Sequence, residues 1–412
     1  MLLGAGRLLC SDRRRPGSAH EAFFREVWRE LPAVRRVFGN SPWRGHRRSA
    51  RRTPGSAMEP CAEPPLFTFG VIADVQYADI DDGANYTRTR ARYYRNSVRL
   101  LRRACRAWSE EDVRPRFVLQ LGDVIDGHNV KHGASERALE TVLRELDGCP
   151  AEVHHVWGNH EFYNFSRDAL LASALNSARL GDGRLARPGD MYVYHFSPAP
   201  CFRLVVLDAY DVSIIGRDET SEKYEEAASI MKEHNSNPDL NHPPGNHDNC
   251  PLMSFSQCRH NCSFFFSVHT VTHGLEQRFV KFNGGFSQDQ LQWLDEVLSL
   301  ADTNQEKVIV VSHLPVHPSS TDPICLAWNH STVLSILHSH SCVVCFIAGH
   351  DHDGGYHQDE LGLHYLTLEG VIETPPHSDA YGTVYVYKDH MFLKGRGRIE
   401  DRVLRYPDHV NG

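Results

Sequence analysis

Short hydrophobic runs alternate with longer amphipathic stretches through most of the chain, a pattern typical of strands and helices in turn. We expect strands at 66–73, 116–121, 153–157, 191–196, 202–207, 307–311, 342–348, 364–368, 383–387 and 391–394. Helices are predicted at 86–108, 135–146, 222–234, 287–300 and 332–338, with Ser287 as an N-cap. Helices alternate with strands early and strands dominate late. The pattern therefore predicts a mixed α/β fold in which helices cover the faces of layered sheets.

The first part of the chain lacks this pattern and differs in charge. Residues 1–57 hold thirteen arginines and four acids, a net charge of +9. Because the whole chain has a net charge of −8, the remaining residues carry −17. We expect residues 1–65 to be an Arg-rich extension without stable structure, 66–405 to be one domain and 406–412 to be a tail. A mitochondrial targeting peptide is the alternative for the extension, although Glu21, Glu26 and Glu30 lie within it and such peptides are poor in acids.

A second interruption lies at about 249–274, where asparagine, proline, histidine and cysteine gather. We interpret this segment as a surface insertion, because its spacing matches none of the paired cysteine and histidine patterns that make a zinc site. The chain has eleven cysteines and no adequate secretory signal, so we expect mostly reduced thiols and do not favour disulfides. We therefore expect a cytoplasmic protein, or a mitochondrial one if the extension is a targeting peptide.

Composition excludes several classes of protein. With 41% hydrophobic residues the chain can bury a full core, so overall disorder is excluded. No hydrophobic run reaches the roughly 18–20 residues of a membrane-spanning helix. The chain is not generically basic, so we expect no nucleic-acid partner and no membrane partner. The unusual number is 26 histidines, because histidine is the commonest metal ligand.

The histidines that matter are those that follow strands. Five predicted strands end in polar residues of metal-ligand type, and in open α/β sheets sites form beyond the carboxyl ends of strands. These residues are Asp74 and Gln76, then Asp123 and Asp126, then Asn159, His160 and Glu161, then His313, and last His350 and His352. Each group alone has a structural explanation as a cap or turn. Five groups at five such junctions predict one metal-binding crevice.

The order of these groups resembles the calcineurin-like metallophosphoesterase superfamily, whose fold is a β-sandwich flanked by helices. Within it, Phe69–Tyr77, Phe279–Gln288, Gly349–Tyr356 and Leu368–Thr374 most closely resemble the manganese-dependent ADP-ribose/CDP-alcohol diphosphatases. The resemblance covers most of Leu66–Arg405. It implies that residues 66–405 form a catalytic domain.

The resemblance also implies a dinuclear site. One metal ion would be held by Asp74, Gln76, Asp123 and His352, and the other by Asn159, His313 and His350, with Asp123 bridging. Two such ions clamp the oxygens of an in-line displacement and lower the pKa of a shared water. Gln76 stands where the wider superfamily has histidine, and a harder ion such as Mn²⁺ tolerates its amide oxygen. Mn²⁺ itself is implied by the resemblance, because raw affinity would favour Zn²⁺.

Further roles follow from the same resemblance. His160 would contact the phosphate and assist the leaving oxygen, with Asp126 and Glu161 orienting the ligands or His160. The substrates would be ADP-ribose, CDP-choline or CDP-glycerol, cleaved to a nucleoside monophosphate and a phosphorylated sugar or alcohol. Residues that could contact them are Tyr77, Tyr86, Phe162 and Cys325.

Two other interpretations remain open from the sequence, a different phosphoesterase activity and a protein without catalytic activity. A phosphomonoesterase or a cyclic-nucleotide phosphodiesterase can use the same metal constellation, because function depends on the pocket rather than on the fold. A non-catalytic scaffold that had lost its metals is the third reading, and the complete ligand set argues against it. We expect an enzyme that acts as a monomer on small-molecule nucleotides.

Overall fold

The computed structural model describes residues 63–85, 88–182, 190–244 and 274–407. The Arg-rich extension therefore lies outside the described residues except for its last three positions, and so does the segment at 249–274 except for Gly274. Tyr86 also lies outside them. Among the described residues, no helix combines the length and apolar character needed to cross a membrane.

Six strands form the first sheet, in the order β14-β13-β12-β1-β4-β5. β1 pairs in parallel with β4, which pairs in parallel with β5, while β12 is antiparallel to β1. Every residue of β1 is buried, as expected for a central strand that is covered on both faces. The strands are β1 (Phe67–Ile72), β4 (Phe117–Gln120), β5 (Glu152–His155), β12 (Ala380–Val386), β13 (His390–Gly397) and β14 (Arg402–Arg405).

A second six-stranded sheet has the order β10-β11-β9-β8-β7-β6. Its four central strands run parallel, and an antiparallel strand closes each edge. The strands are β6 (Tyr194–Ala199), β7 (Phe202–Val206), β8 (Lys307–Val311), β9 (Val343–Ala348), β10 (Gly355–Gln358) and β11 (His364–Thr367). A separate two-stranded ribbon joins β2 (Gly83–Ala84) to β3 (Ala91–Arg92).

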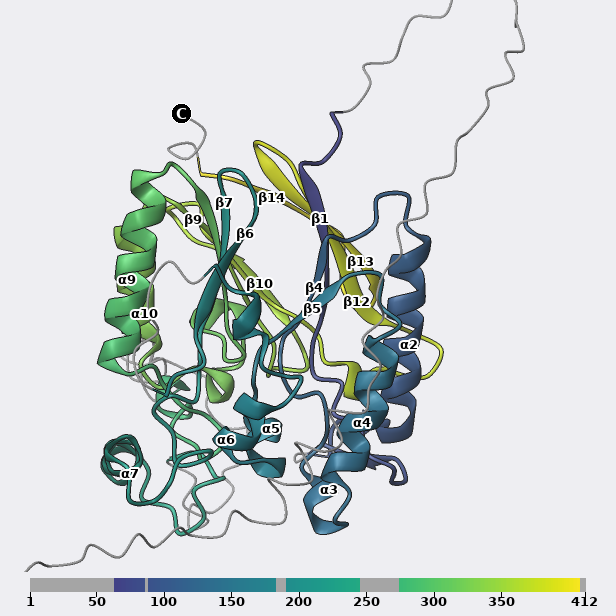
Figure 1. Ribbon diagram of the computed structural model, residues 1–412. Helices are drawn as coiled ribbons and strands as arrows, with labels where there is room; N and C mark the ends of the chain where they lie inside the picture. Colours follow the sequence, from purple (N-terminus) through teal and green to yellow (C-terminus); the bar gives the residue numbers. More distant parts are fainter. Residues whose placement is uncertain (1–62, 86–87, 183–189, 245–273, 408–412) are drawn as a thin grey trace, which may run out of the picture. The chain divides into compact units, whose positions relative to one another are not determined.

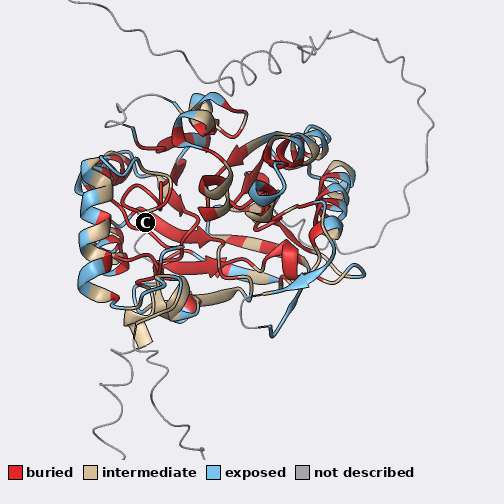
Figure 2. Ribbon diagram, turned by 90° about the horizontal axis from the view of Figure 1, so that it is seen from below, coloured by how far each residue is buried: buried red, intermediate tan, exposed pale blue. Residues whose placement is uncertain are grey.

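Aromatic side chains join the two sheets into a sandwich. The ring of Phe67 in β1 meets Phe202 in β7 edge to face at 5.5 Å, and Phe117 in β4 meets Phe196 in β6 at 5.2 Å. Such pairs add specific geometry to the burial of a large apolar surface. Figure 2 shows the buried strands between helices whose outer faces are exposed. The predicted sandwich is confirmed.

Helices cover both outer faces of the sandwich, with α2 and α4 beside the first sheet and α9 and α10 beside the second (Figure 1). Trp108 of α2 lies directly against β1, since a Cβ placed on Gly70 would come within 2.7 Å of its ring. The helices are α2 (Tyr94–Glu110), α3 (His128–Lys131), α4 (Ser135–Leu146), α5 (Asn159–Asn164), α6 (Arg167–Ala172), α7 (Glu222–His234), α9 (Gln288–Thr303) and α10 (His330–Ser339). Short 3₁₀ helices lie at Ser177–Leu180, Pro318–Ser320, Pro323–Cys325 and Val371–Glu373.

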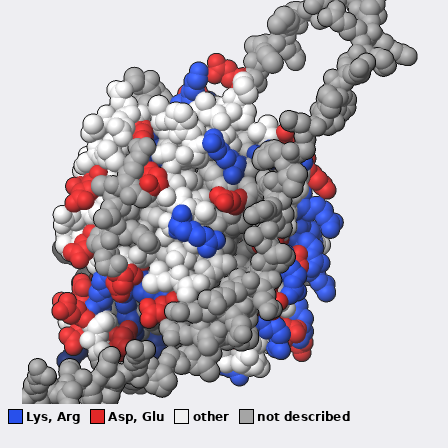
Figure 3. Space-filling model, viewed as in Figure 1, with Lys and Arg blue, Asp and Glu red and all other residues white. Residues whose placement is uncertain are grey.

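Arginines gather on the exposed face of α2, on the right of Figure 3. Several of them are paired with acids: Arg95 with Asp79 and Asp81, Arg102 with Glu145, and Arg103 with Asp379. Exposed pairs of this kind contribute little to stability. Nearby acids therefore neutralise part of the basic face of this helix.

Most predicted elements are confirmed, and two errors are informative. Ser287 caps α9 as predicted, because its hydroxyl accepts the backbone N–H of Gln290. The helix predicted from residue 86 begins only at Tyr94, since Gly83–Ala84 and Ala91–Arg92 pair with each other instead. The short helices α5 and α6 were not predicted, because helices of about two turns leave little periodic signal.

One expectation about cysteine is wrong. Cys105 of α2 and Cys149, just beyond α4, form a disulfide whose Cα atoms lie 4.5 Å apart. Sequence spacing gave no sign of it, because the two residues meet only when the helices pack together. The other described cysteines, Cys201, Cys325, Cys342 and Cys345, are free thiols, as expected.

Replacing Cys149 with serine should lower the free energy of unfolding by about 2–4 kcal/mol under non-reducing conditions. The bond closes a loop with a sequence separation of 44, and crosslinking restricts the unfolded chain. Urea denaturation of the oxidised proteins measures the difference. A reductant should abolish it, and Cys201→Ser, which replaces an exposed free thiol, is the matched control. An unchanged urea midpoint in Cys149→Ser would contradict the expectation.

Candidate metal centre

The predicted ligands lie at the carboxyl ends of strands from both sheets. Asp74 and Gln76 follow β1, Asp123 follows β4 and Asn159 follows β5, while His313 follows β8 and the pair His350 and His352 follows β9. Parallel neighbours place these ends at one edge of each sheet. The fold itself therefore gathers residues that are far apart in the sequence.

The backbone at four of these residues is in the left-handed region. Asp74, Gln76, Asp123 and His350 have φ values of 53°, 41°, 58° and 71°. Non-glycine residues in this region cost free energy and cluster at functional sites, where the surrounding structure holds them. Gly122, with a φ of 103°, gives the chain its tight turn before Asp123. The strand ends are bent so that their side chains turn inward.

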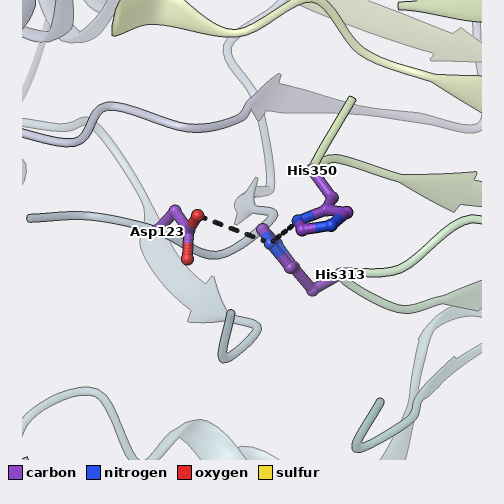
Figure 4. A group of neighbouring side chains, drawn as sticks. All are labelled: Asp123, His313 and His350. Carbon is purple, nitrogen blue, oxygen red and sulfur yellow. Dashed lines mark hydrogen bonds and ion pairs between the residues drawn. The ribbon is translucent and has the colours of Figure 1, made fainter. Parts of the chain in front are cut away.

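Asp123, His313 and His350 form the tightest group, shown in Figure 4. Their ligand atoms lie within 4.8 Å of one another. The Nε2 atom of His313 is 3.6 Å from Oδ2 of Asp123 and 3.2 Å from Nδ1 of His350. Two imidazole nitrogens and a carboxylate facing one point are a donor set suited to a divalent transition metal.

A second group lies on the other side of Asp123. The Nε2 atom of His352 is 3.5 Å from Oδ1 of Asp74 and 3.0 Å from the side-chain nitrogen of Gln76. That nitrogen also donates to Oδ2 of Asp123 at 3.0 Å. Asp123 thus touches both groups, the position that a bridging ligand requires.

Each of the three histidines has one ring nitrogen tied to a protein acceptor. Nδ1 of His313 lies 2.7 Å from the carbonyl oxygen of Leu121, and Nδ1 of His352 lies 2.9 Å from Oε1 of Glu373. Nε2 of His350 lies 2.9 Å from Oδ1 of Asn283. These acceptors hold the proton on the outer nitrogen, so the inner nitrogens keep free lone pairs.

Burial and neighbouring charges act differently on the histidines. Burial, with neighbouring histidines, lowers the pKa of His350 well below its ordinary value. Burial also opposes the charge on His352, but hydrogen bonds to Asp74 and Glu373 outweigh it and raise its pKa to about 9. A metal ion binds only the neutral imidazole, so binding must displace any proton held between His352 and Asp74.

The donor set fits two divalent ions. It offers two carboxylates, three imidazoles and two side-chain amides, arranged around Asp123. The Oδ1 atom of Asp74 is buried and faces the Nε2 atom of His352 at 3.5 Å, too far for a strong hydrogen bond, and a cation bound between them would satisfy both atoms. Gln76 departs from the expectation in orientation, since its amide nitrogen faces the centre and its oxygen lies 3.4 Å from Arg92. Ligation through that oxygen requires the amide to turn over.

His160 lies beside the metal centre with a defined tautomer. Its Nδ1 accepts the backbone N–H of Gly127 at 2.7 Å, so in the neutral ring the proton is on Nε2. That Nε2 lies 3.9 Å from Oδ2 of Asp123. His160 therefore presents an N–H donor to the region beside the predicted ligands.

The two acidic residues expected around this site have clear contacts. Glu161 accepts the backbone N–H groups of Asp123, Val124 and Gly158 at 2.6–2.8 Å, so it ties together the loops that carry Asp123 and Asn159. Burial and the neighbouring Asp123 raise the pKa of Glu161, and these three donors oppose the rise. Asp126 lies 3.5 Å from Nδ1 of His160. Burial opposes its charge, but His160 and His128 lower its pKa to about 2.

The predicted substrate residues are not all gathered at the site. The hydroxyl of Tyr77 lies near Asp79 and Thr141, on the side of α4. Phe162 is buried among Trp157, Tyr210 and the guanidinium of Arg167, and it lines a separate cavity of about 610 Å³. Cys325 is close to the site: burial, followed by the charges of Asp351, Asp322 and Asp74, raises its pKa well above the ordinary value. Of the described candidates, Cys325 is the one whose neighbours Ile324 and Leu326 contact Asn283, which in turn contacts the predicted ligand His350.

Sequence reasoning missed three buried residues that contact the predicted ligands. Glu373 binds His352, Asn283 binds His350, and the hydroxyl of Tyr210 lies 3.2 Å from Oδ1 of Asn159. Glu373 and Asn283 lie in Leu368–Thr374 and Phe279–Gln288, two of the stretches that resemble the family. The resemblance therefore marked these segments but gave neither residue a role. Tyr210 follows β7 without any such signal.

Replacing Glu373 with alanine should weaken Mn²⁺ binding by about 10–100-fold, the usual effect of removing a carboxylate that orients a ligating histidine. Glu373 also pairs with Arg92 at 3.3 Å. The substitution would therefore remove the hydrogen-bond acceptor of His352 and the acidic partner of Arg92. Calorimetric titration of the metal-free protein measures the affinity. Glu360→Ala, an exposed glutamate, is the control. Equal affinities for the two variants would show that Glu373 does not orient His352.

Known proteins are similar to this chain over most of its length. The sequence model of calcineurin-like phosphoesterases matches residues 67–194, which include the loops of Asp74, Asp123 and Asn159. A manganese-dependent ADP-ribose/CDP-alcohol diphosphatase of Danio rerio is 58% identical over 348 residues, covering 84% of this chain and 99% of that protein. Proteins of the same description from Homo sapiens and Arabidopsis thaliana are 50% and 37% identical, each covering 83% of this chain and 93% and 98% of their own lengths.

The fold has a close counterpart among solved structures. The crystal structure of a dimetal phosphatase from Danio rerio matches with a TM-score of 0.73 and 58% sequence identity, covering 83% of this chain and 99% of that one. The resemblance inferred from the strand-end residues is thus confirmed over most of the chain.

Proposed function

Because this chain belongs to the family of manganese-dependent ADP-ribose/CDP-alcohol diphosphatases, we propose that it hydrolyses the pyrophosphate bond of ADP-ribose and of CDP-alcohols such as CDP-choline and CDP-glycerol. ADP-ribose would give AMP and ribose 5-phosphate. A CDP-alcohol would give CMP and the phosphorylated alcohol.

One observation supports this proposal most strongly. The inner nitrogens of His313 and His350 lie with Asp123, and that of His352 lies 3.5 Å from Asp74, while the outer nitrogens are held by Leu121, Asn283 and Glu373 in that order. A scaffold without metal ions would have no need for buried carboxylates and inner imidazole nitrogens that face one another in this way. The site is built to bind cations.

The residues of the chain divide the chemistry among them. Two divalent ions held at the site, Mn²⁺ by family, would neutralise phosphate charge and supply a nucleophile from water near neutral pH. Asp123 reaches both groups of ligands and fixes their separation. Beside it, the Nε2–H of His160 can donate to the oxygen of the departing phosphate, and the backbone N–H of Gly127, which donates to Nδ1, keeps Nε2 pointing inward.

We place the nucleoside of the substrate beside the loop around Cys325. Cys325 ends the 3₁₀ helix Pro323–Cys325, and the backbone carbonyls of its neighbours Ile324 and Leu326 accept from the side-chain nitrogen of Asn283, which contacts His350. A thiol of raised pKa is neutral, and a neutral sulfur suits contact with a base or a ribose better than with a phosphate. We assign no such contact to Phe162, which is committed to packing, or to Tyr77.

We also propose a monomer that acts in the cytoplasm on small-molecule nucleotides, without a nucleic-acid or membrane partner. A substrate of this size needs no second macromolecule for recognition. Light scattering of the purified protein tests the oligomeric state. Fluorescent fusions of the whole chain and of a form starting at Met58 test the compartment, and mitochondrial signal from the whole chain alone would favour targeting by the extension.

The substrate assignment is tested by a panel. Purified protein loaded with Mn²⁺, Mg²⁺ or Zn²⁺ is offered ADP-ribose, CDP-choline, CDP-glycerol, p-nitrophenyl phosphate and cyclic AMP. We expect Mn²⁺ to give the fastest turnover and the diphosphates to have the highest kcat/KM. Preference for p-nitrophenyl phosphate would indicate a phosphomonoesterase, and preference for cyclic AMP would indicate a phosphodiesterase.

A further inference from the structure

Asn283 is a fully buried side chain whose amide orientation is fixed by its surroundings. Its nitrogen donates to the carbonyl oxygens of Arg278, Ile324 and Leu326 at 2.7–3.2 Å. Turning the amide over would place its oxygen against three carbonyl oxygens, with no donor among them. The nitrogen must therefore face these carbonyls, and the oxygen must face the other way.

On that other side lies His350. Oδ1 of Asn283 is 2.9 Å from Nε2 of His350, so this nitrogen carries the proton and Nδ1 keeps the lone pair. Nδ1 is the atom that approaches His313, at 3.2 Å. The backbone of His350 is in the left-handed region, so it needs the surrounding structure to hold it there. The side chain of Asn283 holds the imidazole ring of His350 in place through this hydrogen bond.

The carbonyl groups that orient Asn283 belong partly to the loop of Cys325. Ile324 and Leu326 flank Cys325 directly. The same loop is held a second time near His350, because Oδ2 of Asp351 accepts the backbone N–H of Asp322 at 2.7 Å and the hydroxyl of Thr321 at 2.8 Å. The loop and the histidine are therefore joined through two separate links.

We propose that Asn283 is a positioning residue that selects the donor nitrogen of His350 and, through the same amide, locks the loop 321–326 beside the metal centre. The role deepens the proposed function and rests on it for the identity of the substrate. A ligand that contacts the loop 321–326 and a metal ion bound by His350 would therefore act on the same rigid unit.

The first test measures metal binding without substrate. Asn283→Ala removes both links of the amide, and calorimetric titration of the metal-free protein with Mn²⁺ should show one of two sites weakened by about 10–100-fold. Asn235→Ala is the matched control, since Asn235 is also buried and donates to two carbonyl oxygens, of His242 and Phe279. Two sites of unchanged affinity in a folded Asn283→Ala protein would overturn the proposal.

The second test separates the two links. Asn283→Asp keeps an acceptor for His350 but sets an oxygen against the loop carbonyls. It should keep two Mn²⁺ per chain and raise KM for ADP-ribose several-fold. An unchanged KM, or loss of a metal ion, would overturn the proposed division of roles. If the wild-type protein does not turn over ADP-ribose, the proposed function fails, while the Mn²⁺ titrations still decide the role of Asn283.

Discussion

Replacing Asp123 with alanine is expected to abolish turnover of ADP-ribose and to reduce the bound Mn²⁺ below two ions per chain. Among the described residues, the carboxylate of Asp123 meets ligand side chains of both groups, lying 3.6 Å from His313 and 3.0 Å from Gln76. Its other oxygen accepts the backbone N–H of His160 at 2.9 Å, so the substitution also releases the start of α5. The loss should exceed the roughly 10²–10⁴-fold effect typical of a general acid.

Metal analysis and steady-state kinetics of the same preparation check this expectation. Asp112→Ala, which replaces an exposed aspartate, controls for the loss of a carboxylate as such. Thermal melting shows whether the variant is folded. Full activity with Mn²⁺ in a folded Asp123→Ala protein would be incompatible with the proposed centre.

His160→Gln is expected to give a different pattern, in which metal is retained and kcat falls by about 10²–10⁴-fold. The ring of His160 is not among the ligand atoms that converge on the centre, and its Nε2 is 3.9 Å from Asp123. Removing it should therefore leave two Mn²⁺ per chain in place. Only the N–H group that assists the leaving phosphate is lost.

The leaving group provides the decisive comparison. A p-nitrophenyl ester of a nucleoside monophosphate releases a stable anion, so His160→Gln should slow it far less than it slows ADP-ribose. Equal losses on both substrates would indicate that His160 binds the phosphate without assisting departure. Loss of Mn²⁺ from the variant would assign the residue to the metal centre instead.

The strand ends could be predicted because each is a local pattern. A hydrophobic run followed by a glycine and a polar residue is visible at Asp123, Asn159 and His350 without knowledge of the rest of the fold. The family resemblance then supplied a role for each position. A mixed α/β fold with helices covering layered sheets followed from the alternation of strands and helices, which is also local, whereas the β-sandwich was implied by the resemblance.

What the sequence could not predict depends on contacts between distant segments. Glu373 and Asn283 act on ligands 21 and 67 positions away, and nothing in their spacing links them to His352 and His350. The disulfide between Cys105 and Cys149 depends in the same way on how α2 and α4 pack. The proton on Nε2 of His160 follows from a single backbone N–H of Gly127, which no side-chain pattern reveals.

The division of the ligands between the two sheets has a consequence for assembly of the molecule. Asp74, Gln76, Asp123 and Asn159 come from the first sheet, whereas His313, His350 and His352 come from the second. Neither sheet alone offers a full coordination shell, so high metal affinity can arise only after the two have docked. Conversely, metal ions bound by ligands from both sheets would stabilise the packing of the two sheets against each other at the edge that carries these ligands.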